Sequence, residues 1–138
     1  MVNYDHLHKS LLHLARQQEN LVDTATDRSQ LDQEAVAESV IHIFETCYDC
    51  LWKALRRHLV KELGQAGAPA SPKPLFRLTN ENGMLPSPIE KWLAYADARI
   101  NTAHDYNEDK ARSCLALIED FIIDAAALYE KMSGQKWQ

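Results

Sequence analysis

Apolar residues recur every three or four positions over three long stretches of this 138-residue chain, which is the spacing of one buried helix face. The first stretch covers about 20 residues from Tyr4, the second runs from Gln30 to about Leu63, and the third runs from Ala111 to Met132. No segment alternates apolar and polar residues as a half-buried β-strand does. The pattern therefore predicts three long amphipathic helices.

Gly, Pro and Ser residues mark the connection between the second and third stretches. The segment 64–72 contains two Gly and two Pro, which predicts that the long helix ends there in a loop. Ser71 and Pro72 have the residue types of a helix N-cap and of a first helical position. We therefore expect a short helix to about Asn82, ended by Gly83.

A second start signal precedes a helix of medium length. Ser87 and Glu90 have the spacing of a capping box, so a helix is expected from there to about Ala103. Asn107 can cap the final long helix. The whole pattern predicts a single all-α domain over residues 1–138, an up-and-down antiparallel bundle of four main helices plus one short connecting helix.

The composition limits the classes of function. Fifteen Lys and Arg against 20 Asp and Glu give a net charge of −5, which disfavours broad, non-specific nucleic-acid binding. A local basic run on the second helix, interpreted first as a solvated face, consists of Lys53, Arg56, Arg57, His58 and Lys61. The first residues lack a signal-peptide pattern, no apolar run approaches the ~18 residues of a membrane span, and three cysteines do not suit a disulfide scaffold. We therefore expect a reducing cytoplasm and no membrane.

The pair Cys47-x-x-Cys50 falls in the middle of a predicted helix, within or beside its apolar stripe. Redox-active thiols of this spacing need the helix N-terminus, and a structural zinc site would need two further ligands. We interpret both thiols as small buried side chains and expect no metal and no cofactor.

Histidines near the N-terminus are interpreted as solvated: His6, His8 and His13. Among the tryptophans, Trp52 and Trp92 are expected in the core and Trp137 in a frayed tail.

The segment with most chemical potential is Arg99-Ile-Asn-Thr-Ala-His104-Asp-Tyr106, at the end of the medium helix. Arg forms charge-assisted pairs with phosphate oxygens, and His exchanges protons near neutral pH. On a straight helix the Arg99 and His104 side chains would lie about 140° apart. Either the helix ends near Ala103 and the chain folds back, or the site is composite across a two-fold axis.

The pattern R-x4-H-x-Y at the end of a bundle helix resembles the HEPN superfamily of small helical proteins. More closely, the chain resembles the branch of nucleotidyltransferase substrate-binding subunits, which is related to the toxins of HEPN/MNT toxin–antitoxin pairs. The segment Phe44-Glu…Leu-Trp52-Lys53 and the Ser71-Pro72 pair are similar to that branch in order and spacing. The resemblance implies a bacterial or archaeal cytoplasmic homodimer and a separate minimal nucleotidyltransferase of the MNT type as partner.

The resemblance also implies roles for the site residues. In toxin members of the superfamily the Arg and His carry metal-independent RNA cleavage, so Arg99 would stabilise developing negative charge and His104 would move the proton. Tyr106 stands where toxin members are adenylylated by the partner. The family usually has a polar residue directly after the Arg, whereas here Ile100 follows Arg99 and Asn101 comes one position later.

Glu45, Asp49 and Lys53 form a row at one-turn spacing on the second predicted helix. Such a row is typical of i,i+4 pairing on a helix surface, and lining of a substrate groove is the alternative.

Three hypotheses share this fold. The favoured one is a dimerising substrate-binding or toxin-type subunit that acts with the nucleotidyltransferase. The second is a free-standing, metal-independent endoribonuclease, and the third is a structural helical adaptor. RNA or a nucleotide is the expected substrate in the first two.

Overall fold

The computed structural model describes residues 2–23, 29–103 and 107–138, and this part of the chain forms five α-helices and no strand. The helices are α1 (Asp5–Asp23), α2 (Gln30–Lys61), α3 (Pro72–Glu81), α4 (Ile89–Ala103) and α5 (Glu108–Ser133). The predicted all-α bundle of four main helices and one short connecting helix is confirmed.

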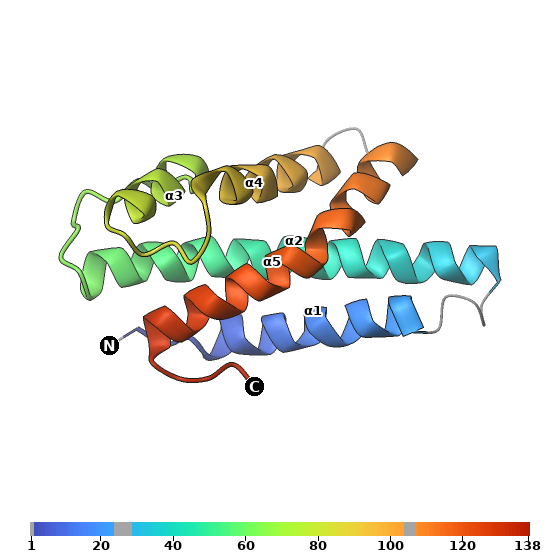
Figure 1. Ribbon diagram of the computed structural model, residues 1–138, viewed down its shortest axis with the longest axis horizontal. Coiled ribbons are helices and arrows are strands. Elements are labelled where there is room, and N and C mark those ends of the chain that lie inside the picture. Colours follow the sequence, from blue (N-terminus) through green and yellow to red (C-terminus); the bar gives the residue numbers. More distant parts are fainter. Residues whose placement is uncertain (1, 24–28, 104–106) are drawn as a thin grey trace.

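α1 and α2 are antiparallel, α3 runs in the same direction as α2, α4 runs back, and α5 reverses direction again (Figure 1). α1 and α2 lie lengthwise against each other, α3 and α4 lie along the other side of α2, and α5 crosses the α1–α2 pair obliquely. α2 touches all four other helices. The longest helix, α2, therefore lies at the centre of the helix contacts, and α4 packs against it.

Local residue chemistry explains where the helices begin and end. The Ser29 hydroxyl accepts from the Asp32 amide at 3.2 Å, and the Asn107 side chain accepts from the Lys110 amide at 2.9 Å, as expected of N-caps. Gly83 has a φ of 69°, a left-handed conformation that favours glycine directly after α3. Ser87, predicted as a cap, accepts a 2.9 Å hydrogen bond from the Trp92 indole.

Aromatic rings fill the centre of the bundle. Rings from four helices contact one another at centroid distances between 5.0 and 6.5 Å: Phe44, Tyr48, Phe76, Trp92, Tyr95 and Phe121. The Trp92 side chain is fully buried, as predicted, whereas Trp52 is only partly buried. This packing joins α2, α3, α4 and α5 in one core.

The C-terminal tail corrects two predictions. Trp137 packs against the core, and its carbonyl oxygen accepts from His8 Nε2 at 2.6 Å. The His8 ring also stacks on Tyr129 of α5, with ring centroids 5.2 Å apart. The tail is therefore held against α1 and is not frayed, and His8 is not a solvated side chain.

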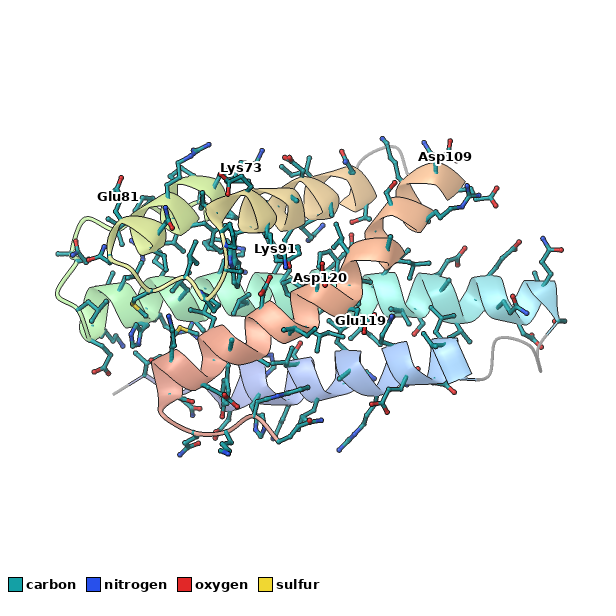
Figure 2. All side chains as sticks on the ribbon, in the orientation of Figure 1. Lys73, Glu81, Lys91, Asp109, Glu119 and Asp120 are labelled. Atoms are coloured by element: carbon teal, nitrogen blue, oxygen red, sulfur yellow. The ribbon has the colours of Figure 1, made fainter. Side chains whose placement is uncertain are left out.

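One buried carboxylate links α4 to α5. The Asp124 side chain accepts a 2.5 Å hydrogen bond from the Tyr95 hydroxyl, and Lys91 Nζ lies 3.6 Å from the same oxygen. Lys91 also lies 3.8 Å from Asp120, and both side chains project into the space between the two helices (Figure 2). The pairing compensates the burial of this charge.

None of the helices in the described ranges is long and apolar enough to cross a lipid bilayer.

Candidate functional site

The C-terminal half of α4 directs Arg99 onto two carboxylates of α2. Arg99 Nη1 lies 3.2 Å from Glu45 Oε2, and Arg99 Nη2 lies 3.2 Å from Asp49 Oδ2. Glu45 and Asp49 share one face of α2 because they are four residues apart. A planar guanidinium fork suits two such acceptors at once. We call these three residues the arginine clamp.

A hydroxyl completes the arginine clamp from the same helix turn as the arginine. Thr102, which is buried, donates to Glu45 Oε2 at 2.8 Å. His42 adds a neighbour at the other carboxylate oxygen, with Nδ1 3.8 Å from Glu45 Oε1. Thr102 was not identified from the sequence, although its position three residues after Arg99 puts it on the same helix face.

The arginine retains donor capacity. The Arg99 side chain is 27% exposed. Its Nε atom is buried and has no hydrogen-bond partner among the described residues. The two carboxylates outweigh the single positive charge, which leaves the arginine clamp with a formal charge of −1. An incoming anion would have to displace a carboxylate from Arg99.

An apolar groove begins at the arginine clamp. It has a volume of about 490 Å³ and lies between α2, α3 and α4. Its wall includes Tyr48, Trp52, Pro72 and Ile100. Ile100, the residue that departs from the family pattern, is 49% exposed. Burial raises the pKa of the Tyr48 phenol above its ordinary value.

Lys53 and Asn101 do not join the arginine clamp. Lys53 lies one turn beyond Asp49 on α2, and its Nζ is 5.8 Å from the centre of the Trp52 ring. Asn101 is exposed in a separate groove of about 300 Å³ between α4 and α5. The predicted row of Glu45, Asp49 and Lys53 exists on α2, but both of its carboxylates pair with Arg99.

His104 and Tyr106 lie outside the described residues. Their predicted roles therefore stay predictions. The two predicted alternatives, a site within one chain and a composite site across a two-fold axis, stay predictions as well.

The thiols are not activated. Burial raises the pKa of Cys47 to about 12 and also raises that of Cys50. Within residues 2–23, 29–103 and 107–138, no three His, Cys, Asp or Glu side chains form a group that could hold a metal ion.

Comparison with known proteins supports the same family. The family model described as "Nucleotidyltransferase substrate binding protein like" matches residues 2–134. A Haemophilus influenzae protein named "Probable ribonuclease HepT" is 29% identical, with 83% of each chain covered.

Two solved structures share the fold. One, from Haemophilus influenzae, is described as a substrate-binding domain of a nucleotidyltransferase; it has a TM-score of 0.83 at 25% identity and covers 94% of this chain and 98% of that one. A Thermus thermophilus structure has a TM-score of 0.68 at 27% identity and covers 87% of this chain and 98% of that one. With the helical architecture and the family match over residues 2–134, the chain belongs to the HEPN-like family of nucleotidyltransferase substrate-binding proteins.

Proposed function

We propose that this chain is a substrate-binding, toxin-type subunit that dimerises and acts with a separate minimal nucleotidyltransferase. The nucleotidyltransferase would act on the surface formed by Arg99, His104 and Tyr106. The observation that carries the proposal is the arginine clamp: Arg99 is held at the α4 end by Glu45 and Asp49, only five residues before His104 in the sequence. An anchored guanidinium that is followed in the sequence by a histidine and a phenol suits the handling of phosphate groups.

Tyr106 is the proposed acceptor of a nucleotide. Its phenolic oxygen would attack the α-phosphorus of ATP, the bond to the β-phosphate oxygen would break, and pyrophosphate would leave. The phenolic proton would pass to a base such as His104. The product would carry bulk and negative charge beside Arg99, which would block access of other phosphates to the guanidinium.

Dimerisation would bring two of these surfaces together. The exposed Ile100 and the apolar groove next to it support a subunit interface near the arginine clamp, because an exposed apolar patch often marks an interface. A composite site would then take residues from α4 of both subunits.

Analytical ultracentrifugation tests the assembly. The chain alone should sediment as a dimer at micromolar concentration, and addition of a candidate minimal nucleotidyltransferase should produce a larger, stable species. Ile100→Asp should give a monomer, while Ile123→Asp, at an exposed apolar position on α5, serves as the matched control. A monomeric wild type that does not bind the nucleotidyltransferase would contradict the proposal.

Metal-independent RNA cleavage is a second candidate, favoured by the ribonuclease name of the Haemophilus influenzae relative. His104 would assist attack of a ribose 2′-OH on the adjacent phosphorus or protonate the leaving oxygen, and Arg99 would stabilise the negative charge. Cleavage of single-stranded RNA in the presence of a metal chelator, abolished by Arg99→Ala and by His104→Ala, would support it. Absence of cleavage by the unmodified wild type would exclude it.

A further inference from the structure

A second groove lies on the other side of Asp49, between α1 and α2. It has a volume of about 340 Å³, and its wall includes Thr46, Asp49 and Cys50 from α2 and His6 from α1. Asp49 borders both this groove and the apolar groove beside Arg99. The two grooves are therefore neighbours that share one carboxylate, and that carboxylate is paired with Arg99.

Two cations of α2 line the groove between α1 and α2. Lys53 and Arg57 are exposed and lie four residues apart, so they project from the same helix face about 6 Å apart along the axis. Within the part of the chain that the structure describes, neither forms an ion pair. Arg56, by contrast, donates from Nε to the Pro69 carbonyl oxygen at 3.2 Å. Lys53 and Arg57 are thus available to an external anion.

The groove has a formal charge of +1, because Lys53 and Arg57 outnumber its one carboxylate, Asp49. Asp49 Oδ2 lies 3.2 Å from Arg99 Nη2, with which it forms an ion pair, whereas Lys53 and Arg57 have no such partner among the described residues. Their field reaches the Cys50 thiol: both cations act to lower its pKa, although burial and Asp49 act more strongly and leave it raised. The His6 imidazole adds a hydrogen-bonding group to the wall of the groove.

We propose that His6, Lys53 and Arg57 form a phosphate subsite in the groove between α1 and α2, next to the arginine clamp. The subsite binds the phosphate groups of a single RNA strand or of a nucleotide. Successive cations one helix turn apart suit successive phosphates of an extended strand, and each contact releases condensed counterions. The inference rests on the proposed function in one respect, since the ligand is the phosphate-bearing substrate that Arg99 handles.

The rate of Cys50 alkylation measures whether a ligand occupies the groove. The thiol is partly exposed there, whereas Cys47 and Cys114 are buried. Alkylation of the whole chain would be followed by mass spectrometry at a pH near the ordinary thiol pKa of about 8.5. When an oligouridine occupies about nine-tenths of the molecules, Cys50 should react about tenfold more slowly, since only the free fraction is accessible.

A parallel arm with ATP identifies the source of the phosphate. Protection by oligouridine alone assigns the groove to a strand, and equal protection by ATP assigns it to a nucleotide. Unchanged Cys50 alkylation with both ligands, or equal slowing of all three thiols, would overturn the subsite.

Salt dependence measures the contacts themselves. The double variant Lys53→Gln/Arg57→Gln should reduce the slope of log affinity for oligouridine against log salt by about 1.4, from about 0.7 for each lost contact to a single strand. The matched control is Lys9→Gln/Lys136→Gln, which removes the same charge from exposed positions outside the groove. An equal slope for both double variants would contradict the subsite.

The two proposals can fail separately. These binding assays use the chain without any nucleotidyltransferase, so failure of complex formation does not affect their outcome. A chain that binds the nucleotidyltransferase but shows an unprotected Cys50 would overturn the phosphate subsite and leave the proposed function standing.

Discussion

Arg99 on α4 and Glu45 on α2 form an ion pair with a 3.2 Å distance between Nη1 and Oε2, although 54 residues separate them in the sequence. The same carboxylate oxygen accepts from Thr102 at 2.8 Å. The end of α4 is therefore tied to the middle of α2, and the direction of the arginine is set before any ligand binds. The carboxylates of Glu45 and Asp49 compete with any phosphate that approaches Arg99.

The ion pair should contribute measurably to stability. Arg99→Ala leaves Glu45 and Asp49 as unpaired like charges one turn apart, so we expect a loss of about 1–2 kcal/mol in the free energy of unfolding. Urea denaturation of Arg99→Ala, Glu45→Gln and the double variant measures the coupling, expected at about 0.5–1 kcal/mol. Strictly additive single-variant effects would show that the pair is energetically inert.

Removing the carboxylates should strengthen anion binding. Glu45→Gln/Asp49→Asn takes away two charges that compete with phosphate for Arg99, so affinity for oligouridine should rise about fivefold, or ~1 kcal/mol. Titration calorimetry checks this. Glu81→Gln/Glu119→Gln is the control, because it removes equal charge from exposed positions on α3 and α5 (Figure 2). An equal gain in affinity for oligouridine in the two double variants would show that the effect comes from net charge and not from Arg99.

Stability should fall in alkaline solution because of two buried phenols. Burial raises the pKa values of Tyr48 and Tyr95 above the ordinary 10.0, and the Asp124 hydrogen bond raises that of Tyr95 further. The unfolded chain loses these protons first, so the stabilisation is complete below pH 10 and is lost as pH rises toward the folded-state values. The free energy of unfolding should fall by about 1.4 kcal/mol per pH unit for each phenol. Urea denaturation at a series of pH values from pH 9 upward measures this loss. The free energy of unfolding of Tyr95→Phe should fall less steeply with pH than that of the wild type, and an equal pH dependence in both proteins would contradict the prediction.

A buried histidine should act in the opposite pH range. Burial lowers the pKa of His58, whose Nδ1 lies 2.7 Å from the Tyr4 hydroxyl. Below pH 6.5 the unfolded chain binds a proton that the folded chain resists, so stability should fall as pH decreases. Thermal melts between pH 7 and about pH 5 should show a smaller loss for His58→Asn than for the wild type. An identical pH dependence in both would exclude His58 as the source.

Much of the fold could be predicted because its signals are local. The apolar periodicity, the Ser71-Pro72 start and the Asn107 cap each act within a few residues of the backbone that they shape. The helices predicted from these signals agree with those observed. Ser87 shows the limit of such local signals. The sequence predicts that its hydroxyl caps a helix, whereas in the structure the hydroxyl accepts a hydrogen bond from the Trp92 indole.

The candidate site was harder because its partners come from distant segments. The sequence singled out Arg99, Glu45 and Asp49, but as two separate groups on different helices. Only the packing of α4 on α2 makes them one cluster. The contact between His8 and Trp137 spans 129 residues and had no local signal.

Intact-mass spectrometry tests most directly whether the Arg99–Tyr106 surface is where a nucleotidyltransferase acts. The chain would be incubated with a candidate minimal nucleotidyltransferase and with Mg²⁺-ATP, and Tyr106→Phe would be treated in parallel. The account predicts that the wild type gains the mass of one AMP group and that Tyr106→Phe gains none. An unmodified wild-type chain in a stable complex with the active nucleotidyltransferase, or equal modification of Tyr106→Phe, would contradict it.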